Sequence, residues 1–187
     1  KSAKQAILGS RGNSGVILAQ FLSGFSQSLD GIIDCDGITL AKALTHGAHS
    51  AYAAVSDPVE GTMLTVLRDL SDAATETANK PEPDIVDILQ ESVSAAHKSL
   101  DKTPSLLPVL REAGVVDSGG QGIVVFMEGL LAGLLERDPH LIDIKINSEN
   151  RPCDQSTSQA NGNYLERVKQ ERYGFCTQFI LEADPLN

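Results

Sequence analysis

Residues 41–55 read AKALTHGAHSAYAAV, and this stretch decides the fold class. Its apolar residues recur with the 3.6-residue period of an α-helix and fall on one face. That face consists of Ala41, Leu44, Ala48, Ala51 and Val55. A helix of this kind must bury its apolar side, so the stretch predicts a core built from packed helices.

The same spacing predicts further helices on both sides of this stretch. They cover residues 17–25, 63–70, 85–100 and 123–135. A short helix over 106–111 is expected because Pro104 and Pro108 fit a first turn but not the interior of a longer helix. The short connections predict antiparallel neighbours, and the nearly all-apolar 123–135 is expected to be the most enclosed helix. We therefore predict an all-α fold, an antiparallel barrel or bundle of about six helices.

The composition agrees with a helical core of small and aliphatic side chains. Of the 187 residues, 41% are apolar and only 4% aromatic, with no Trp. The 25 acidic residues exceed the 15 basic ones, which gives a formal net charge of −10. This charge disfavours nucleic acids and anionic membranes as partners.

The cysteines and the longest apolar run bear on the location of the protein. Cys35, Cys153 and Cys176 are odd in number and widely spaced, which favours free thiols in a reducing compartment. The apolar run 122–135 contains Glu128 and is shorter than the roughly 18 residues of a membrane span. We therefore expect a cytoplasmic protein with no membrane span.

Three parts of the chain differ in composition. Residues 1–137 contain the helical patterns, 138–172 are polar and predict a linker, and 173–187 predict the first strand of a following domain. Cys176 falls in this short β element, where a buried thiol is expected. Because the first residue is Lys1 and this strand has barely begun at the end, we expect a fragment of a longer protein.

A glycine-rich turn leads directly into the first long helix, with the sequence GSRGNSGVIL at residues 9–18. Free amide groups at a helix N-terminus and closely approaching glycine backbone suit a phosphate. Arg11 would add charge to such a site, or be solvated or paired with a carboxylate. The alternative is a plain helix start, in which Asn13 or Ser14 serves as the N-cap.

Two other helix starts could take part in a site, and the first of them has the same design. Residues 115–122 read VVDSGGQG and precede the last helix, so two glycine-rich starts could surround one anion or could both be ordinary caps. Residues 58–65 read PVEGTMLT. There Thr62 could bond a ligand and Met63 could pack on a flat ring, although a Thr62 N-cap and a core Met63 are the commoner outcome.

Together the motifs at 9–18, 58–66 and 114–122 resemble one known family. They are similar to the nucleotide-binding domain shared by the dihydroxyacetone kinase ATP-binding subunit and the large subunit of bacterial fatty acid kinase. The order and spacing of the motifs also fit, and the resemblance covers residues 1–137. It implies the C-terminal part of an ATP-binding helical barrel whose first helices are missing from this chain.

The resemblance also implies roles for individual residues. Gly12, Asn13, Ser14 and Gly15 would lie at the phosphates of ATP. Thr62 and Met63 would lie near the adenosine moiety, and Asp117 with Gly119 would close the pocket. The family holds Mg²⁺ with an Asp-rich loop that would lie upstream of Lys1, so we expect no catalytic or metal ligand in this fragment.

Other candidate metal ligands are weaker. Asp34 and Asp36 follow the first helix, and Asp36 is better interpreted as the N-cap of a helix beginning near Thr39. His46 and His49 lie one turn apart but have no carboxylate or cysteine at ligand spacing.

The resemblance to the fatty acid kinase group implies that the full-length protein phosphorylates a fatty acid carboxylate presented by a separate acyl-binding protein. The alternatives are a dihydroxyacetone kinase subunit and a non-catalytic nucleotide-binding module. A subunit of the dihydroxyacetone type should end near the last helix, whereas this chain continues. The isolated fragment is expected to be inactive. The surface that its missing helices would cover is expected to form a homodimer or another compensating contact.

Overall fold

The computed structural model describes residues 2–135, and their side chains from residue 5 onward. This part contains seven α-helices and no strand, which confirms the all-α prediction. The helices are α1 (Ser2–Gly9), α2 (Gly12–Ser28), α3 (Gly37–Ala53), α4 (Met63–Ala78), α5 (Ile85–Leu106), α6 (Pro108–Ala113) and α7 (Ser118–Leu134). The predicted linker, the predicted strand and Cys176 lie outside the described residues.

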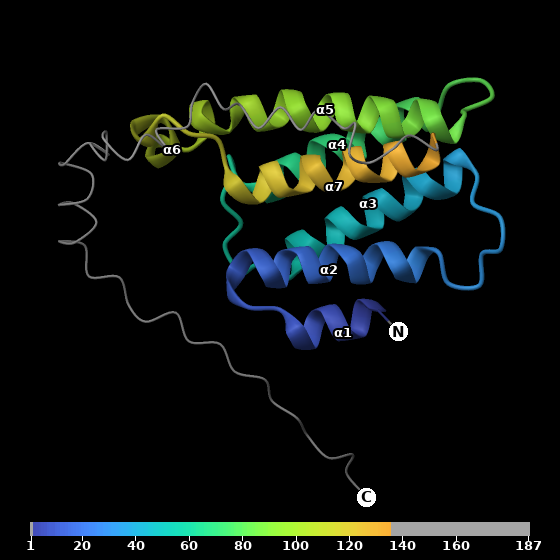
Figure 1. Ribbon diagram of the computed structural model, residues 1–187, viewed down its shortest axis with the longest axis horizontal. Coiled ribbons are helices and arrows are strands. Elements are labelled where there is room, and N and C mark those ends of the chain that lie inside the picture. The colour runs from blue at the N-terminus through green and yellow to red at the C-terminus, as the bar shows by residue number, and fades with distance from the viewer. Residues whose placement is uncertain (1, 136–187) are drawn as a thin grey trace, which may run out of the picture.

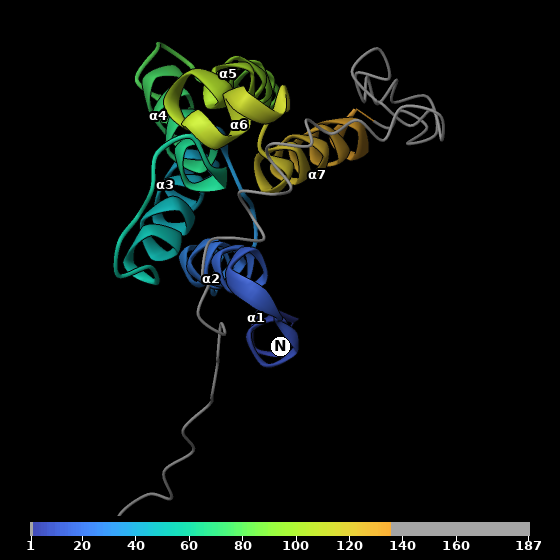
Figure 2. The same cartoon turned by 90° about the vertical axis from the view of Figure 1, so that its left-hand side faces the viewer.

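The long helices form an antiparallel arrangement. Helices α2, α4 and α7 run in one direction and α3 and α5 run in the other (Figure 1). Packing joins α2 to α3, α3 to α4 and α4 to α5, and α7 packs on both α4 and α5. Viewed from the end, α2, α3, α4 and α5 form an arc with α7 beside α5 (Figure 2).

Helix α4 lies at the centre of the core. Its buried side chains include Leu64, Val66, Leu67 and Leu70, all at most 2% exposed. Its neighbour α3 contributes a row of small residues that allows close helix approach. A Cβ atom added at Gly47 of α3 would lie 2.8 Å from Cδ2 of Phe21 on α2. The contact between α2 and α3 therefore depends on the absence of a side chain at residue 47.

The expectation that the last helix is the most enclosed is wrong. Helix α7 buries Ile123, Val124 and Met127, but Phe126 and Leu130 are 37% exposed. The reason is that α7 packs only on α4 and α5, so one side of this apolar helix has no partner in the described part of the chain. Helix α4, which has more buried residues than any other described helix, takes the central place. The expected homodimer remains a prediction.

The expected helix boundary at Pro104 is also wrong. Helix α5 continues through Pro104 to Leu106, and the short helix starts at Pro108 instead of 106. A proline at 104 has no N–H to donate to the carbonyl of Leu100. The hydroxyl of Thr103 donates to that oxygen at 2.7 Å and satisfies the acceptor. Proline is therefore tolerated in the last turn of this helix.

Helix α1 was not predicted, because its eight residues are too few to show a periodic pattern. Two aspartates occupy helix N-caps. Asp36 caps α3 by accepting a hydrogen bond from the Thr39 amide at 2.8 Å, as expected. Asp84 occupies the N-cap of α5 without a side-chain hydrogen bond. None of the helices in residues 2–135 has the length and apolar character needed to cross a membrane.

Candidate functional site

The three predicted helix starts lie at one end of the fold. The N-termini of α2, α4 and α7 are all at the left in Figure 1, because these helices run in the same direction. The starts of α4 and α7 touch, since a Cβ atom added at Gly119 would lie 3.2 Å from Sδ of Met63. The start of α2 is at the same end, but a Cβ atom at Gly12 would have no neighbour within 4 Å.

The start of α2 has no side-chain cap. Arg11 is the N-cap residue, with extended backbone and no capping hydrogen bond. The alternative in which Asn13 or Ser14 caps this helix is therefore wrong, because both residues lie inside its first turn. Gly12, Asn13 and Ser14 are exposed. The first amide groups of a helix have no partner within the helix, so here they remain open to solvent.

Residues 10–12 determine the shape and charge of the α2 start. The hydroxyl of Ser10 donates to the carbonyl of Ile7 at 2.8 Å, and Ser10 packs over Gly15. Gly12 has a φ of +67°, a backbone conformation that favours glycine. Arg11 is exposed and forms no ion pair within residues 5–135. The start of α2 therefore combines free amide donors with an unpaired positive charge.

The start of α4 is capped. The hydroxyl of Thr62 accepts from the Leu64 amide at 3.4 Å and donates to the Val59 carbonyl at 2.8 Å. Met63 is only 4% exposed and belongs to the core. The structure thus confirms the cap and the core residue. A contact of either side chain with a nucleotide stays a prediction.

The start of α7 is capped by a carboxylate. Oδ2 of Asp117 accepts from the Gly120 amide at 2.6 Å, and the amide of Asp117 donates to Oγ1 of Thr103 at 3.1 Å. An anionic cap already interacts with the positive end of the helix dipole. The α7 start therefore suits an anion less well than the α2 start, and the roles expected for Asp117 and Gly119 stay predictions.

A polar cluster beside the α4 start was missed from sequence. The carboxylate of Glu60 accepts from Thr65 Oγ1 at 2.8 Å, from Arg68 Nη1 at 2.8 Å and from Tyr52 Oη at 3.2 Å. We call these four residues the Glu60 clamp. The quoted motif includes Glu60 and Thr65, but their contact depends on the loop folding back along α4. The local sequence hints at this cluster only by placing two polar side chains, Thr65 and Arg68, one turn apart in the first two turns of α4.

The surroundings of the Glu60 clamp set its protonation. Partial burial raises the pKa of Glu60. Hydrogen bonds from Thr65, Arg68 and Tyr52 and the charge of Arg68 lower it by more, so the pKa lies below its usual value. Burial, together with the charge of Glu60, raises the pKa of Tyr52 to about 12. At neutral pH Glu60 is therefore an acceptor and Tyr52 a donor.

The other candidate ligands are separate. His46 shares a hydrogen bond of 2.8 Å with Ser28, and His49 is exposed. Asp34 is exposed, while Asp36 caps α3. Within the described residues no group of three or more His, Cys, Asp or Glu side chains could hold a metal ion.

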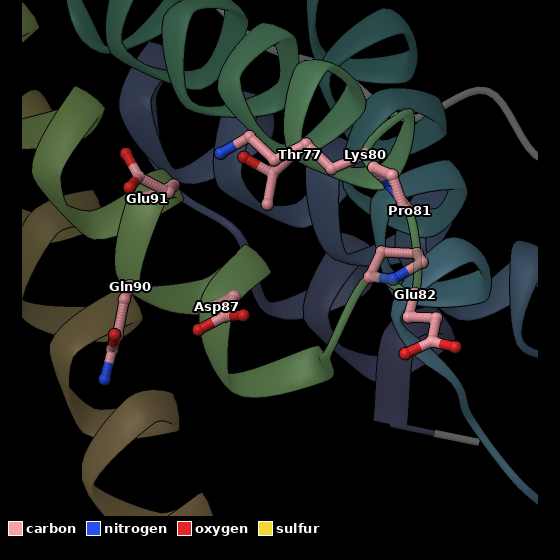
Figure 3. A pocket seen from close by; sticks show the side chains of 8 residues that line it. Thr77, Lys80, Pro81, Glu82, Asp87, Gln90 and Glu91 are labelled. Atoms are coloured by element: carbon pink, nitrogen blue, oxygen red, sulfur yellow. The ribbon is translucent and has the colours of Figure 1, made fainter.

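A small surface pocket lies away from the three helix starts. It has a volume of about 130 Å³ and lies where α4 ends and α5 begins, at the opposite end of these helices. Figure 3 shows its lining side chains, which include Lys80, Glu82, Asp87 and Glu91. With three carboxylates and one lysine, it is a poor match for an anionic ligand.

Several proteins of staphylococci are similar to this chain. It is 38% identical over 179 residues to uncharacterized proteins of Staphylococcus haemolyticus and Staphylococcus epidermidis, and 37% identical to one of Staphylococcus aureus. Each match covers 96% of this chain but only 32% of the relative. The chain therefore spans about a third of the length of these relatives.

A family model described as the DAK2 domain matches residues 1–132. This match includes all seven described helix starts and the three glycine-containing motifs. Because it covers more than half of the chain, the chain belongs to the DAK2 domain family, the group of dihydroxyacetone-kinase-like domains.

Proposed function

We propose that this chain is the ATP-binding domain of a kinase and that the phosphates of ATP bind at the start of α2. One observation carries the proposal most directly. Of the three helix starts at this end, only the α2 start lacks a side-chain cap. Its amide donors, the positive end of the helix dipole and Arg11, which has no ion pair within residues 5–135, all favour a bound anion.

Family membership supports the kinase role in general. Phosphoryl transfer depends mainly on positioning the nucleotide and neutralising the charge of its phosphates, and little on side chains that form covalent bonds to the substrate. A site made from helix ends suits such a task, since backbone donors are fixed before the ligand binds. The capped starts of α4 and α7 would then line the pocket on the side of the adenosine moiety.

We propose a fatty acid carboxylate, presented by a separate acyl-binding protein, as the group that receives the phosphate. The support is the resemblance together with the relatives, whose matched part continues past the family domain and makes up 32% of their length. In those relatives the domain is one part of a longer protein.

Magnesium does not fit the residues described here, because they contain no suitable cluster of acidic ligands. Asp36 is engaged as a cap and Asp117 as another. We propose that the ligands of a Mg²⁺ ion lie outside residues 5–135.

Replacing Ser14 with Ala is expected to weaken ATP binding about tenfold, because a hydrogen bond to a charged group contributes roughly 1.5 kcal/mol. Ser14 is exposed and is not the N-cap, so the melting temperature should not change. Ser26→Ala is the matched control, since Ser26 is an exposed serine in the last turn of the same helix. Calorimetric titration and thermal melting of both variants make the test. Equal ATP affinity in wild type and Ser14→Ala would exclude Ser14 from the site.

The acceptor is tested with a protein of the full length of the relatives. Supplied with ATP, Mg²⁺ and a fatty acid on an acyl-binding protein, it should form acyl phosphate, detected by trapping with hydroxylamine. Phosphorylation of dihydroxyacetone in place of the fatty acid would replace the proposed acceptor by a small ketose and would leave the ATP site unaffected.

A further inference from the structure

The loop that leads into α4 is held by a chain of hydrogen bonds. The amide of Gly61 donates to Oγ1 of Thr65 at 2.8 Å, and the same hydroxyl donates to Oε2 of Glu60 at 2.8 Å. Thr65 is 1% exposed, so the hydroxyl in the middle of this relay is shielded from water. The conformation of residues 59–62 is thus coupled directly to the Glu60 carboxylate.

Helices α3 and α4 hold the other side of this carboxylate directly, and α5 is connected to it through Asp69. Tyr52 reaches Glu60 from α3, and Arg68 reaches it from the second turn of α4. Nε and Nη2 of Arg68 also donate to Oδ1 of Asp69, at 3.1 and 2.9 Å. Oδ2 of Asp69 in turn accepts from Ser99 of α5 at 2.6 Å. The loop is therefore linked through Glu60 to α3 and α4, and through Arg68 and Asp69 to α5.

The charges in this network are balanced internally. Arg68 lies between two carboxylates, those of Glu60 and Asp69. Three hydrogen bonds to these carboxylates hold its guanidinium in place. The side chains of Glu60 and Arg68 are 47% and 44% exposed, and ion pairs at such exposure contribute little to stability. A network that adds little stability but fixes one loop suggests a role in positioning that loop.

We infer that Glu60 is a positioning residue of the ATP site: its carboxylate holds residues 59–62 so that the start of α4 presents a fixed surface to the nucleotide. This inference rests on the proposed function, in which α2 takes the phosphates and α4 lies on the adenosine side. Glu60 acts through the loop and does not touch the ligand. Its removal should therefore affect recognition of the nucleoside and leave recognition of the phosphates unchanged.

The experiment compares two ligands, ATP and inorganic triphosphate, by calorimetric titration of the 187-residue chain. Glu60→Ala should bind ATP at least fivefold more weakly than wild type while binding triphosphate equally well. Ser14→Ala should weaken both ligands. Glu76→Ala, which removes an exposed carboxylate from the last part of α4, is the matched control and should change neither.

A second variant guards against a folding defect. Glu60→Gln retains one acceptor oxygen for Thr65 or Arg68, so it should lose less ATP affinity than Glu60→Ala and keep triphosphate binding. Unchanged ATP affinity in both variants, or an equal loss for both ligands accompanied by a lower melting temperature, would overturn the inference while Ser14→Ala still supports the site. Failure of the wild-type chain to bind either ligand would overturn the proposed function and this inference together.

Discussion

Replacing Gly47 with Val is expected to destabilise the fold by about 3 kcal/mol and to lower the melting temperature by about 10 °C. A Cβ atom at this position would lie 2.8 Å from Cδ2, 2.9 Å from Cε2 and 2.9 Å from the carbonyl oxygen of Phe21. The Phe21 ring is 1% exposed and stacks on Phe25, with 6.1 Å between ring centroids, so it has little room to move. Relief of the clash requires α2 and α3 to separate. Urea unfolding followed by circular dichroism measures the loss.

Glycines on α7 provide the control for this prediction. A Cβ atom at Gly129 or Gly133 would have no neighbour within 4 Å. Gly129→Ala and Gly133→Ala should therefore raise the free energy of unfolding by up to about 1 kcal/mol, the difference in helix propensity between glycine and alanine. A Gly47→Val protein as stable as wild type would show that α2 and α3 are not packed as described.

The second large effect is expected at Gly61. Gly61→Ala should lower the free energy of unfolding by about 2 to 4 kcal/mol, because backbone strain and a steric clash combine. The residue has a φ of +82°, and an added Cβ atom would lie 2.9 Å from Cβ and 3.0 Å from the backbone nitrogen of Leu107. The same substitution should weaken ATP binding, since the Gly61 amide is part of the relay to Glu60. Thermal melting and nucleotide titration of one preparation give both values.

Gly114→Ala separates the two penalties at Gly61. Gly114 also has a positive φ, +69°, but its Cβ position is in open space. The Gly114→Ala substitution should therefore lower the free energy of unfolding by only roughly 1 kcal/mol, the cost of the left-handed backbone conformation. If Gly61→Ala costs no more than Gly114→Ala, the packing of the α4 loop against the turn between α5 and α6 contributes nothing.

The long helices were predictable because each has an apolar face with regular spacing. Residues of α3 such as Leu44 and Ala48 recur on one side and are buried there. Local sequence was less informative where a contact distant in the chain decides the outcome. The exposure of α7 depends on how many helices pack on it, and this number cannot be read from the apolar sequence of α7 itself. Pro104 is accepted because the Thr103 hydroxyl replaces the missing donor.

The candidate site shows the same division. Sequence motifs identified the starts of α2, α4 and α7, since glycine-rich turns before apolar runs are local features. The Glu60 clamp was missed because Glu60 contacts Thr65 and Arg68 five and eight residues away, outside the usual helical spacings of three and four. Tyr52 joins it from another helix. Such a cluster becomes visible only when the loop conformation is known.

The most direct test of the ATP site is amide chemical-shift mapping of the isotope-labelled chain during titration with ATP. Binding at the start of α2 predicts that the largest shift changes occur at Gly12, Asn13, Ser14 and Gly15, with smaller changes at Thr62 and Gly119. Changes confined to Thr77, Lys80 and the other residues of the pocket between α4 and α5, or no changes at all, would contradict it.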